Sequence, residues 1–190
     1  LGDVSGKGMN ASLLMAKTIS LFHCLAKRIS SPGALLAAIN DEVAETATRG
    51  MFVTLVAGEY DPPTQRVVFA NAGHQPLLLH LASGEFQEFE AQAPPIGIFA
   101  RVDYPEQSLS LADGSLYLFT DGLTEGKQQE GTPLGEAGVR RLIEQHAGLA
   151  APQRLQALAA PLQFPGAVLY DDLTLLVIDS ASSLPQFLAI

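Results

Sequence analysis

Apolar residues near the start of the chain recur at the spacing of an α-helix. Within residues 9–29 the recurring positions are Leu13, Leu14, Ala16, Thr18, Leu21, Leu25 and Ile29. The sequence Ser31-Pro32-Gly33 interrupts this pattern, and proline is well tolerated in a first helical turn. A second helix is therefore expected, ending at Arg49-Gly50, with one apolar side formed by Leu35, Leu36, Ile39 and Val43.

After Gly50 the pattern changes to that of β-strands. Residues 51–60 are rich in β-branched and aromatic side chains, and residues 66–70 return after an Asp-Pro-Pro-Thr turn, which predicts a hairpin. Residues 77–81 and 85–89 predict a second hairpin around Ser83-Gly84. Two more strands are expected at 108–111 and 115–120, separated by a turn at 112–114.

The last third of the chain returns to helical patterns before a final strand. Helices are expected at 136–146 and 152–162. The strand expected at 173–178 is apolar throughout, which predicts burial on both faces. Helices, hairpin-linked strands, and then helices with one strand are typical of an α+β fold built on antiparallel sheets.

Length and composition fit one folded domain. A chain of 190 residues that is 47% hydrophobic can form one sizeable core, and the sequence predicts a domain at 1–180 and a C-terminal tail at 181–190. The first residues contain no Met and no basic segment ahead of an apolar run, so we expect a domain cut from a longer polypeptide.

The charge balance argues against several classes of partner. The chain has 20 Asp and Glu against 11 Lys and Arg, a net charge of −9, so nucleic acid is a poor partner. No run of about 18 apolar residues is present, so no membrane span is expected. The low cysteine content is compatible with a reducing compartment, and the expected location is the cytoplasm. The single cysteine, Cys24, excludes an internal disulfide and a cysteine-rich zinc site, and its apolar neighbours predict a buried side chain.

Three segments place aspartates where apolar elements begin or end. Asp3 lies in a glycine-rich turn, Asp121 follows an apolar strand, and Asp171 and Asp172 directly precede the last strand. Carboxylates without cysteines or paired histidines suit hard cations such as Mg²⁺ or Mn²⁺. Two such ions would polarise a phosphate and lower the pKa of a bridging water. The glycines around Asp3 let the backbone turn closely, which could expose the carbonyl of Val4 as a further ligand.

Each acidic segment also has a simpler interpretation. An Asp-Gly pair such as Asp121-Gly122 is most often a turn, and Asp171-Asp172 alone is more often a solvated strand entry or a capping pair. The glycine-rich sequence at 2–8 suggests a phosphate-binding loop. Its Gly-Lys pair is not followed by Ser or Thr as in a P-loop, however, because Met9 follows Gly8.

Taken together and in this order, the segments resemble the type-2C (PPM) metal-dependent protein phosphatases, in particular their bacterial SpoIIE/RsbU-like branch. The matching stretches are GDVSGKGMNASLLMA from Gly2, MFVTL from Met51, NAGHQPLLL from Asn71, PPIGI from Pro94, LYLFTDGLTEG from Leu116 and DDLTLLVI from Asp171. They extend over nearly the whole chain and keep the order found in the family.

This resemblance implies a sandwich of two antiparallel β-sheets flanked by helices, with a binuclear Mn²⁺ or Mg²⁺ site. By position, Asp3 matches the metal-bridging aspartate and Val4 the residue that gives a backbone carbonyl. Asp121 matches the aspartate of the family's Asp-Gly motif, and Asp171 matches the ligand of the final acidic motif, with Asp172 as its neighbour. The implied reaction is removal of phosphate from Ser or Thr by a metal-bound hydroxide, with Asp3, Asp121 and Asp171 as the catalytic set.

The resemblance also implies partners and one gap. Members of this branch act on phosphorylated anti-anti-sigma (STAS) proteins and follow a sensor, receiver or coiled-coil domain, which implies a role in signal transduction that includes two-component regulation. In the family another aspartate ligand precedes the segment that matches Asp3, and this chain starts too late to contain it. The first strands and one ligand are therefore expected to be missing.

Other polar residues have both a functional and a structural interpretation. His74 could be a general acid, but the pattern favours a structural role in a turn. Lys7 could attract phosphate or be a solvated loop residue, and Thr120 and Thr124 could orient Asp121 or satisfy backbone groups. Ser5 is not expected to be a nucleophile, because no His-Asp pair is placed to activate it.

Two classes of function follow. The leading one is an active protein-serine/threonine phosphatase, and the alternative is a non-catalytic regulatory module that keeps the fold and binds a partner in a response-regulator or sigma-factor pathway. Clustered carboxylates favour the enzyme, because they repel one another without a cation. The first two helices, 9–49, are a candidate surface for a homodimer or for docking of the upstream sensor.

Overall fold

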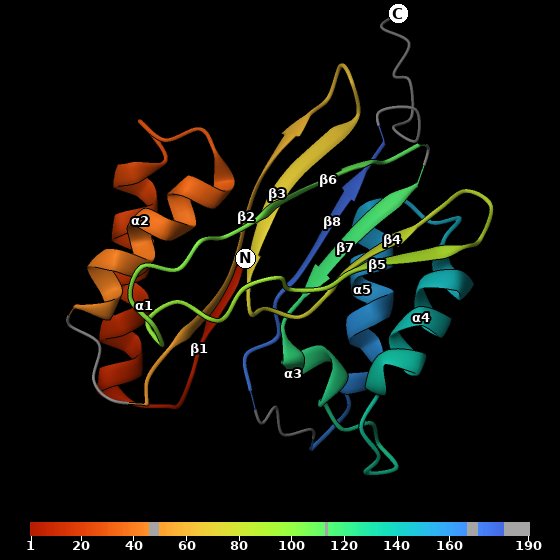
Figure 1. Ribbon diagram of the computed structural model, residues 1–190. Helices are drawn as coiled ribbons and strands as arrows, with labels where there is room; N and C mark the ends of the chain where they lie inside the picture. The colour runs from red at the N-terminus through yellow and green to blue at the C-terminus, as the bar shows by residue number, and fades with distance from the viewer. Residues whose placement is uncertain (46–49, 113, 167–170, 181–190) are drawn as a thin grey trace, which may run out of the picture. The chain divides into compact units, whose positions relative to one another are not determined.

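The computed structural model describes residues 1–45, 50–112, 114–166 and 171–180 (Figure 1). The contacts between residues divide the chain into two compact units. The first contains Leu1–Pro76 with Glu90–Ser110, and the second contains Leu77–Phe89 with Leu111–Ile190. Each unit has its own four-stranded antiparallel sheet with helices, which confirms the predicted α+β class. The predicted tail at 181–190, the predicted end of the second helix at 46–49 and position 113 of a predicted turn lie outside the described residues.

The sheet of the first unit is built around one long hairpin. Its strands, in spatial order, are β1 (Gly2–Val4), β2 (Val53–Asp61), β3 (Arg66–Ala72) and β6 (Glu106–Ser110). The β2–β3 pairing extends from Leu55 opposite Ala72 to Asp61 opposite Arg66, which confirms the first predicted hairpin. The short strand β1 pairs with the start of β2, so the Asp3 segment is fixed to the sheet by backbone hydrogen bonds.

Helices α1 (Met9–Leu25) and α2 (Pro32–Ala44) belong to the same core as this sheet (Figure 1). Leu36, Ile39 and Val43 of α2 are fully buried there with Ala70 and Ala72 of β3. Helix α1 ends earlier than its apolar pattern predicts. The amides of Arg28 and Ile29 both donate to the carbonyl of Leu25, so the chain leaves the helix in a turn.

The apolar pattern of α1 predicts burial correctly on one side only. Thr18 is buried, whereas Leu13 is 61% exposed and Cys24 is exposed. The expected burial of Cys24 is therefore wrong. At about 100° per residue, Leu13 and Cys24 lie well over 90° around the helix axis from Thr18, so they point away from the core. Apolar sequence neighbours did not indicate this direction.

The second unit has its own sheet, and its helices lie beside that sheet in Figure 1. Its strands, in spatial order, are β5 (Phe86–Phe89), β4 (Leu77–His80), β7 (Ser115–Phe119) and β8 (Leu175–Asp179). The helices are α3 (Asp121–Thr124), α4 (Gly135–His146), α5 (Ala151–Ala159) and the 3₁₀ turn η1 (Ala160–Leu162). Their core residues include Tyr117, Phe119, Leu123, Val139, Ile143 and Leu158. The second hairpin and both predicted late helices are confirmed.

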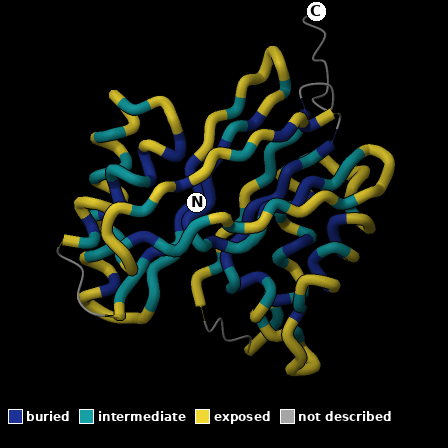
Figure 2. Tube along the Cα trace, viewed as in Figure 1, coloured by how far each residue is buried: buried dark blue, intermediate teal, exposed yellow. Residues whose placement is uncertain are grey.

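The expected burial of the last strand on both faces is wrong. β8 lies at the edge of its sheet, and its Leu176 is 43% exposed. Figure 2 shows how far the described residues are buried along the chain. β7 is an interior strand of the sheet, and its Leu116 and Tyr117 are completely buried. A run of apolar residues does not distinguish a central strand from an edge strand, because the order of strands is set by tertiary pairing. Over the described residues, none of the helices combines the length and apolar character needed to cross a membrane.

The start of α2 is tied to the last strand of its sheet. The Ser31 hydroxyl accepts a hydrogen bond from the amide of Ala34 at 3.1 Å, the usual N-cap contact. The same hydroxyl donates to a carboxylate oxygen of Glu106 at 2.5 Å, and the amide of Gly33 donates to that oxygen at 3.1 Å. A carboxylate at a helix N-terminus satisfies free amides and interacts favourably with the helix dipole.

Replacing Ser31 by Ala removes the cap and the hydroxyl that binds Glu106. We expect Ser31→Ala to lower the free energy of unfolding by about 1 kcal/mol, measured by chemical denaturation. Ser20→Ala is the control, because the Ser20 hydroxyl donates to the carbonyl of Ala16 within α1 and Ala is a good helix former. Equal losses in the two variants would contradict the capping role.

The Glu106 contact also predicts a dependence on pH. The hydrogen bonds from Ser31 and from the amide of Gly33 lower the pKa of Glu106 below its ordinary value. A depressed carboxyl pKa stabilises the fold above the ordinary glutamate pKa, and this contribution is lost as the pH falls through the lowered pKa. Glu106→Gln is expected to lower the melting temperature at neutral pH and to match the parent in acid. Glu90→Gln, at an exposed position, should show no such trend.

Candidate functional site

Asp121 lies where the central strand of the second unit passes into a short helix. β7 ends at Phe119, Thr120 is extended, and Asp121 is the first residue of α3. Its Oδ1 atom is buried and has no hydrogen-bond partner among the residues that the structure describes. A buried carboxylate oxygen without a partner is costly, and each such atom needs an explanation such as an ion or a water.

Thr120 holds the acidic pair beside this position. Its hydroxyl donates to the carbonyl of Asp172 at 2.9 Å and accepts from the amide of Thr174 at 3.0 Å. The amide of Thr120 donates to the carbonyl of Thr174 at 3.1 Å. Thr120 is only 2% exposed, so these bonds are shielded from water. The hydroxyl therefore binds backbone groups of the Asp172 segment, and Thr124 likewise binds the carbonyl of Asp121 at 3.1 Å.

Gly122 lets the two segments touch. A Cβ atom at this position would lie 2.5 Å from the carbonyl oxygen of Asp172 and 3.0 Å from its carbonyl carbon. Both neighbours are backbone atoms, which cannot rotate away as a flexible side chain would. The Asp121-Gly122 pair is therefore more than a surface turn, because it packs against the backbone of Asp171 and Asp172. The Asp121-Gly122 segment and the backbone of Asp171 and Asp172 thus meet at one end of the sheet of the second unit.

Asp3 and Val4 lie in the other unit. They sit on β1 opposite Thr54 and Val53. Next to them, the Ser5 hydroxyl accepts from the amide of Phe52 at 2.8 Å, and the Ser5 amide donates to the carbonyl of Phe52 at 2.9 Å. Ser5 is thus an anchor of the turn.

His74 belongs to a buried polar network of the first unit that the sequence revealed only in part. Its amide donates to Oδ1 of Asn71 at 2.8 Å, and the Asn71 side-chain amide donates to the carbonyls of His74 and Gln75, both at 3.3 Å. Its Nδ1 lies 2.9 Å from Oγ1 of Thr54, which donates to the carbonyl of Asp3 at 3.4 Å. These contacts favour the structural interpretation of His74. Asn71 and Thr54 carry no recognisable catalytic signal.

The predicted metal ligands are therefore brought together only in part. Asp121, Asp171 and Asp172 converge within the second unit, whereas Asp3 and Val4 belong to the first. Among the described residues, no group of three or more His, Cys, Asp or Glu side chains is arranged to hold a metal ion. The available donors are carboxylate and carbonyl oxygens, which suit a hard divalent cation, and the buried Oδ1 of Asp121 fits such a ligand.

Comparison with known proteins gives a consistent match. Residues 1–180 match the family described as Stage II sporulation protein E (SpoIIE). The phosphoserine phosphatase RsbU of Bacillus subtilis is 28% identical over 181 residues, which cover 94% of this chain and 54% of RsbU. The phosphoserine phosphatase RsbP of the same organism is 32% identical over 133 residues, which cover 65% of this chain and 32% of RsbP. The chain thus spans about half, or less, of the length of these relatives.

Solved structures share the fold. The SiaA-PP2C domain of Pseudomonas aeruginosa matches with a TM-score of 0.78 and 20% identity over 94% of this chain and 72% of that one. The PP2C phosphatase domain of SpoIIE from Bacillus subtilis, solved with a fragment of its regulatory domain, matches with a TM-score of 0.73 and 20% identity over 94% of this chain and 52% of that one. At this identity the likeness establishes the PP2C-type fold.

The contact at Gly122 predicts a cost for any side chain there. We expect Gly122→Ala to lower the free energy of unfolding by about 1–3 kcal/mol, because the new methyl group must displace the Asp172 backbone. Gly148→Ala is the matched control, since a Cβ there meets no atom within 4 Å. Thermal denaturation of the two variants measures the difference. A Gly122→Ala variant as stable as Gly148→Ala would contradict the described packing.

Proposed function

From the premise that this chain belongs to the SpoIIE family, we propose that it is a protein-serine/threonine phosphatase domain. The proposed reaction is the hydrolysis of a phosphoserine or phosphothreonine on a regulatory protein by a metal-activated water. The relatives that are named phosphoserine phosphatases support the reaction class. The fold supports it as well, since the solved structures that match are PP2C domains.

The observation that carries this proposal is the buried Oδ1 of Asp121, which has no partner in the described part of the chain. A carboxylate in that position repels the neighbouring acidic segment, and burial raises the cost of its charge. A divalent cation removes both costs. An ordinary structural role would instead give Asp121 a hydrogen-bond donor, as Arg154 does for Asp179 in the same unit.

Within the second unit, the residues that would hold the metal are Asp121 and Asp171, with Asp172 beside them. Asp3 and the carbonyl of Val4, in the first unit, are proposed as ligands from the family resemblance alone. When bound, Mn²⁺ or Mg²⁺ would supply charge for the phosphate oxygens and a water of lowered pKa. The chain itself contributes the placement of its oxygens. Thr120 fixes the Asp172 backbone, Gly122 permits the close approach, and pairing with β2 fixes the backbone of Asp3.

The proposed substrate is a phosphorylated anti-anti-sigma (STAS-type) protein, as the resemblance implies. The relatives RsbU and RsbP are larger than the part matched here, which supports a sensor or receiver domain in the same polypeptide. A homodimer through α1 and α2 and a cytoplasmic location belong to the same proposal. The exposed Met9, Leu13 and Ile19 of α1 are in line with a docking role for that helix.

The test is phosphatase activity of the full-length protein with Mn²⁺ or Mg²⁺, on p-nitrophenyl phosphate and on a phosphoserine-containing STAS protein. Asp121→Asn removes a charge without changing the size of the side chain, and we expect kcat/KM to fall by at least about a hundredfold. Calorimetry should show weaker Mn²⁺ binding in the same variant.

Asp103→Asn is the matched control, because Asp103 is an exposed carboxylate outside the acidic segments. It should keep both activity and Mn²⁺ affinity. A parent protein that binds no divalent cation and hydrolyses neither compound would overturn the phosphatase proposal. That result would favour the non-catalytic partner-binding module.

A further inference from the structure

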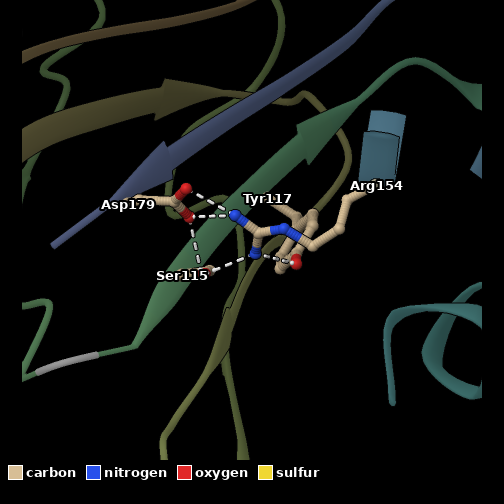
Figure 3. A network of polar contacts seen from close by, with 4 residues as sticks. All are labelled: Ser115, Tyr117, Arg154 and Asp179. Carbon is tan, nitrogen blue, oxygen red and sulfur yellow. Dashed lines mark hydrogen bonds and ion pairs between the residues drawn. The ribbon is translucent and has the colours of Figure 1, made fainter. Parts of the chain in front are cut away.

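A second buried polar cluster lies in the same sheet, at the far end of β7 and β8 from the acidic residues. Arg154 of α5 reaches across both strands (Figure 3). Its Nη1 donates to the hydroxyls of Ser115 at 2.8 Å and Tyr117 at 2.7 Å. Its Nη2 donates to both carboxylate oxygens of Asp179, and the contact with Oδ1 measures 2.5 Å. Ser115 also donates to Asp179 at 2.7 Å.

This cluster is shielded from water. The side chains of Arg154 and Asp179 are only 6% and 13% exposed. Burial alone would lower the pKa of Arg154, but the hydrogen bonds and charges of Asp179 and Tyr117 raise it above its ordinary value. Because the guanidinium is planar and its Nη1 is held by the hydroxyls of Ser115 and Tyr117, its Nη2 meets the carboxylate in one orientation. Moving Asp179 away would leave a buried cation without its counter-ion.

The strand that carries Asp179 lies at a sheet edge, where contacts at its two ends help to define its register. β8 is Leu-Leu-Val-Ile-Asp, pairing with β7 from Phe119 opposite Leu175 to Ser115 opposite Asp179. A slip by one residue would turn every side chain to the opposite face, whereas a slip by two residues keeps each side chain on its face. Burial of one face of β8 therefore does not by itself prevent a slip by two residues.

Such a slip would move the strand by roughly 7 Å. Asp171 and Asp172 lie only a few residues before β8, so they would leave the backbone of Gly122 and the hydroxyl of Thr120. The polar contacts at the two ends of β8 thus both depend on the register in which β8 pairs with β7.

We propose that Arg154 is a positioning residue that fixes the register of β8 and thereby holds Asp171 and Asp172 beside Asp121. Its role in catalysis depends on the proposed function, whereas its effect on the register does not. Arg154 lies on α5, so the orientation of this helix is coupled to the placement of the acidic pair.

Cross-linking of introduced cysteines measures the register directly, in the full-length protein with Cys24 replaced by Ser. Leu118 and Leu176 are partners in the observed register, so L118C/L176C should form a disulfide. Leu116 and Leu176 are diagonal neighbours, too far apart for a disulfide, but they become partners after a slip by two residues. Leu118 and Ile178 become partners after a slip in the other direction.

With Arg154 present, we expect only the L118C/L176C pair to cross-link. In an Arg154→Met background, L116C/L176C or L118C/I178C should cross-link as well. If Arg154→Met fails to fold, the double replacement Arg154→Met with Asp179→Leu removes both buried charges and keeps apolar bulk. Cross-linking confined to the observed register in the background that folds would overturn the proposal.

Measurements of Mn²⁺ affinity and of kcat and KM distinguish a positioning role of Arg154 from a purely stabilising one. In the double variant the melting temperature should recover toward that of the parent, whereas Mn²⁺ affinity should stay about tenfold weaker and kcat should fall more than KM changes. Oxidising L118C/L176C in that background should restore Mn²⁺ affinity, and reduction should abolish the rescue. Recovery of stability, Mn²⁺ affinity and kcat together without the disulfide would contradict the positioning role.

The two proposals fail in different ways. A parent protein without phosphatase activity would contradict the proposed function, while the cross-linking pattern would still report the effect of Arg154 on register. An active parent whose Arg154 variants keep the observed register would contradict only the present inference.

Discussion

The antiparallel pairing of β7 with β8 is the constraint on which the acidic end of the second unit depends. β7 is a buried interior strand that leads into Asp121, and β8 begins at Leu175, shortly after Asp171 and Asp172. Their backbone hydrogen bonds bring segments about 50 residues apart in the chain to one end of one sheet. The hydroxyl of Thr120 and the absence of a side chain at Gly122 then set how closely these segments approach.

The sequence was sufficient to predict most elements, because their signals are local. The hairpin of β2 and β3, the Pro32 start of α2 and the late helices follow from periodicity, turns and caps. The errors concern tertiary contacts. Cys24 lies on the outer side of α1 although its neighbours are apolar, and β8 lies at an edge although its residues resemble a central strand. Neither fact is encoded in a window of a few residues.

The candidate site shows the same division. Its three acidic segments were predicted from the sequence, because their aspartates lie at the ends of apolar elements. The structure places the Asp121 segment against the backbone of Asp171 and Asp172. The residues that fix them, Thr120 and Gly122, could be named from sequence but not assigned, since their partners are backbone atoms of a distant segment. Arg154 gave no signal at all, because an arginine in a helix of mixed composition is usually solvated.

The two ends of the β7–β8 pair differ in whether a buried carboxylate has a hydrogen-bond donor from the protein. At one end both carboxylate oxygens of Asp179 accept from Nη2 of Arg154, and Oδ1 also accepts from the hydroxyl of Ser115. At the other end Oδ1 of Asp121 is buried without a donor in the described residues. This fold supplies its own cation for the carboxylate of Asp179. It supplies no donor for Oδ1 of Asp121 among the described residues, so the two ends of the strand pair differ in this respect. Under the proposed function, a divalent cation takes the place that Arg154 fills for Asp179, and both ends are then neutralised along the same pair of strands.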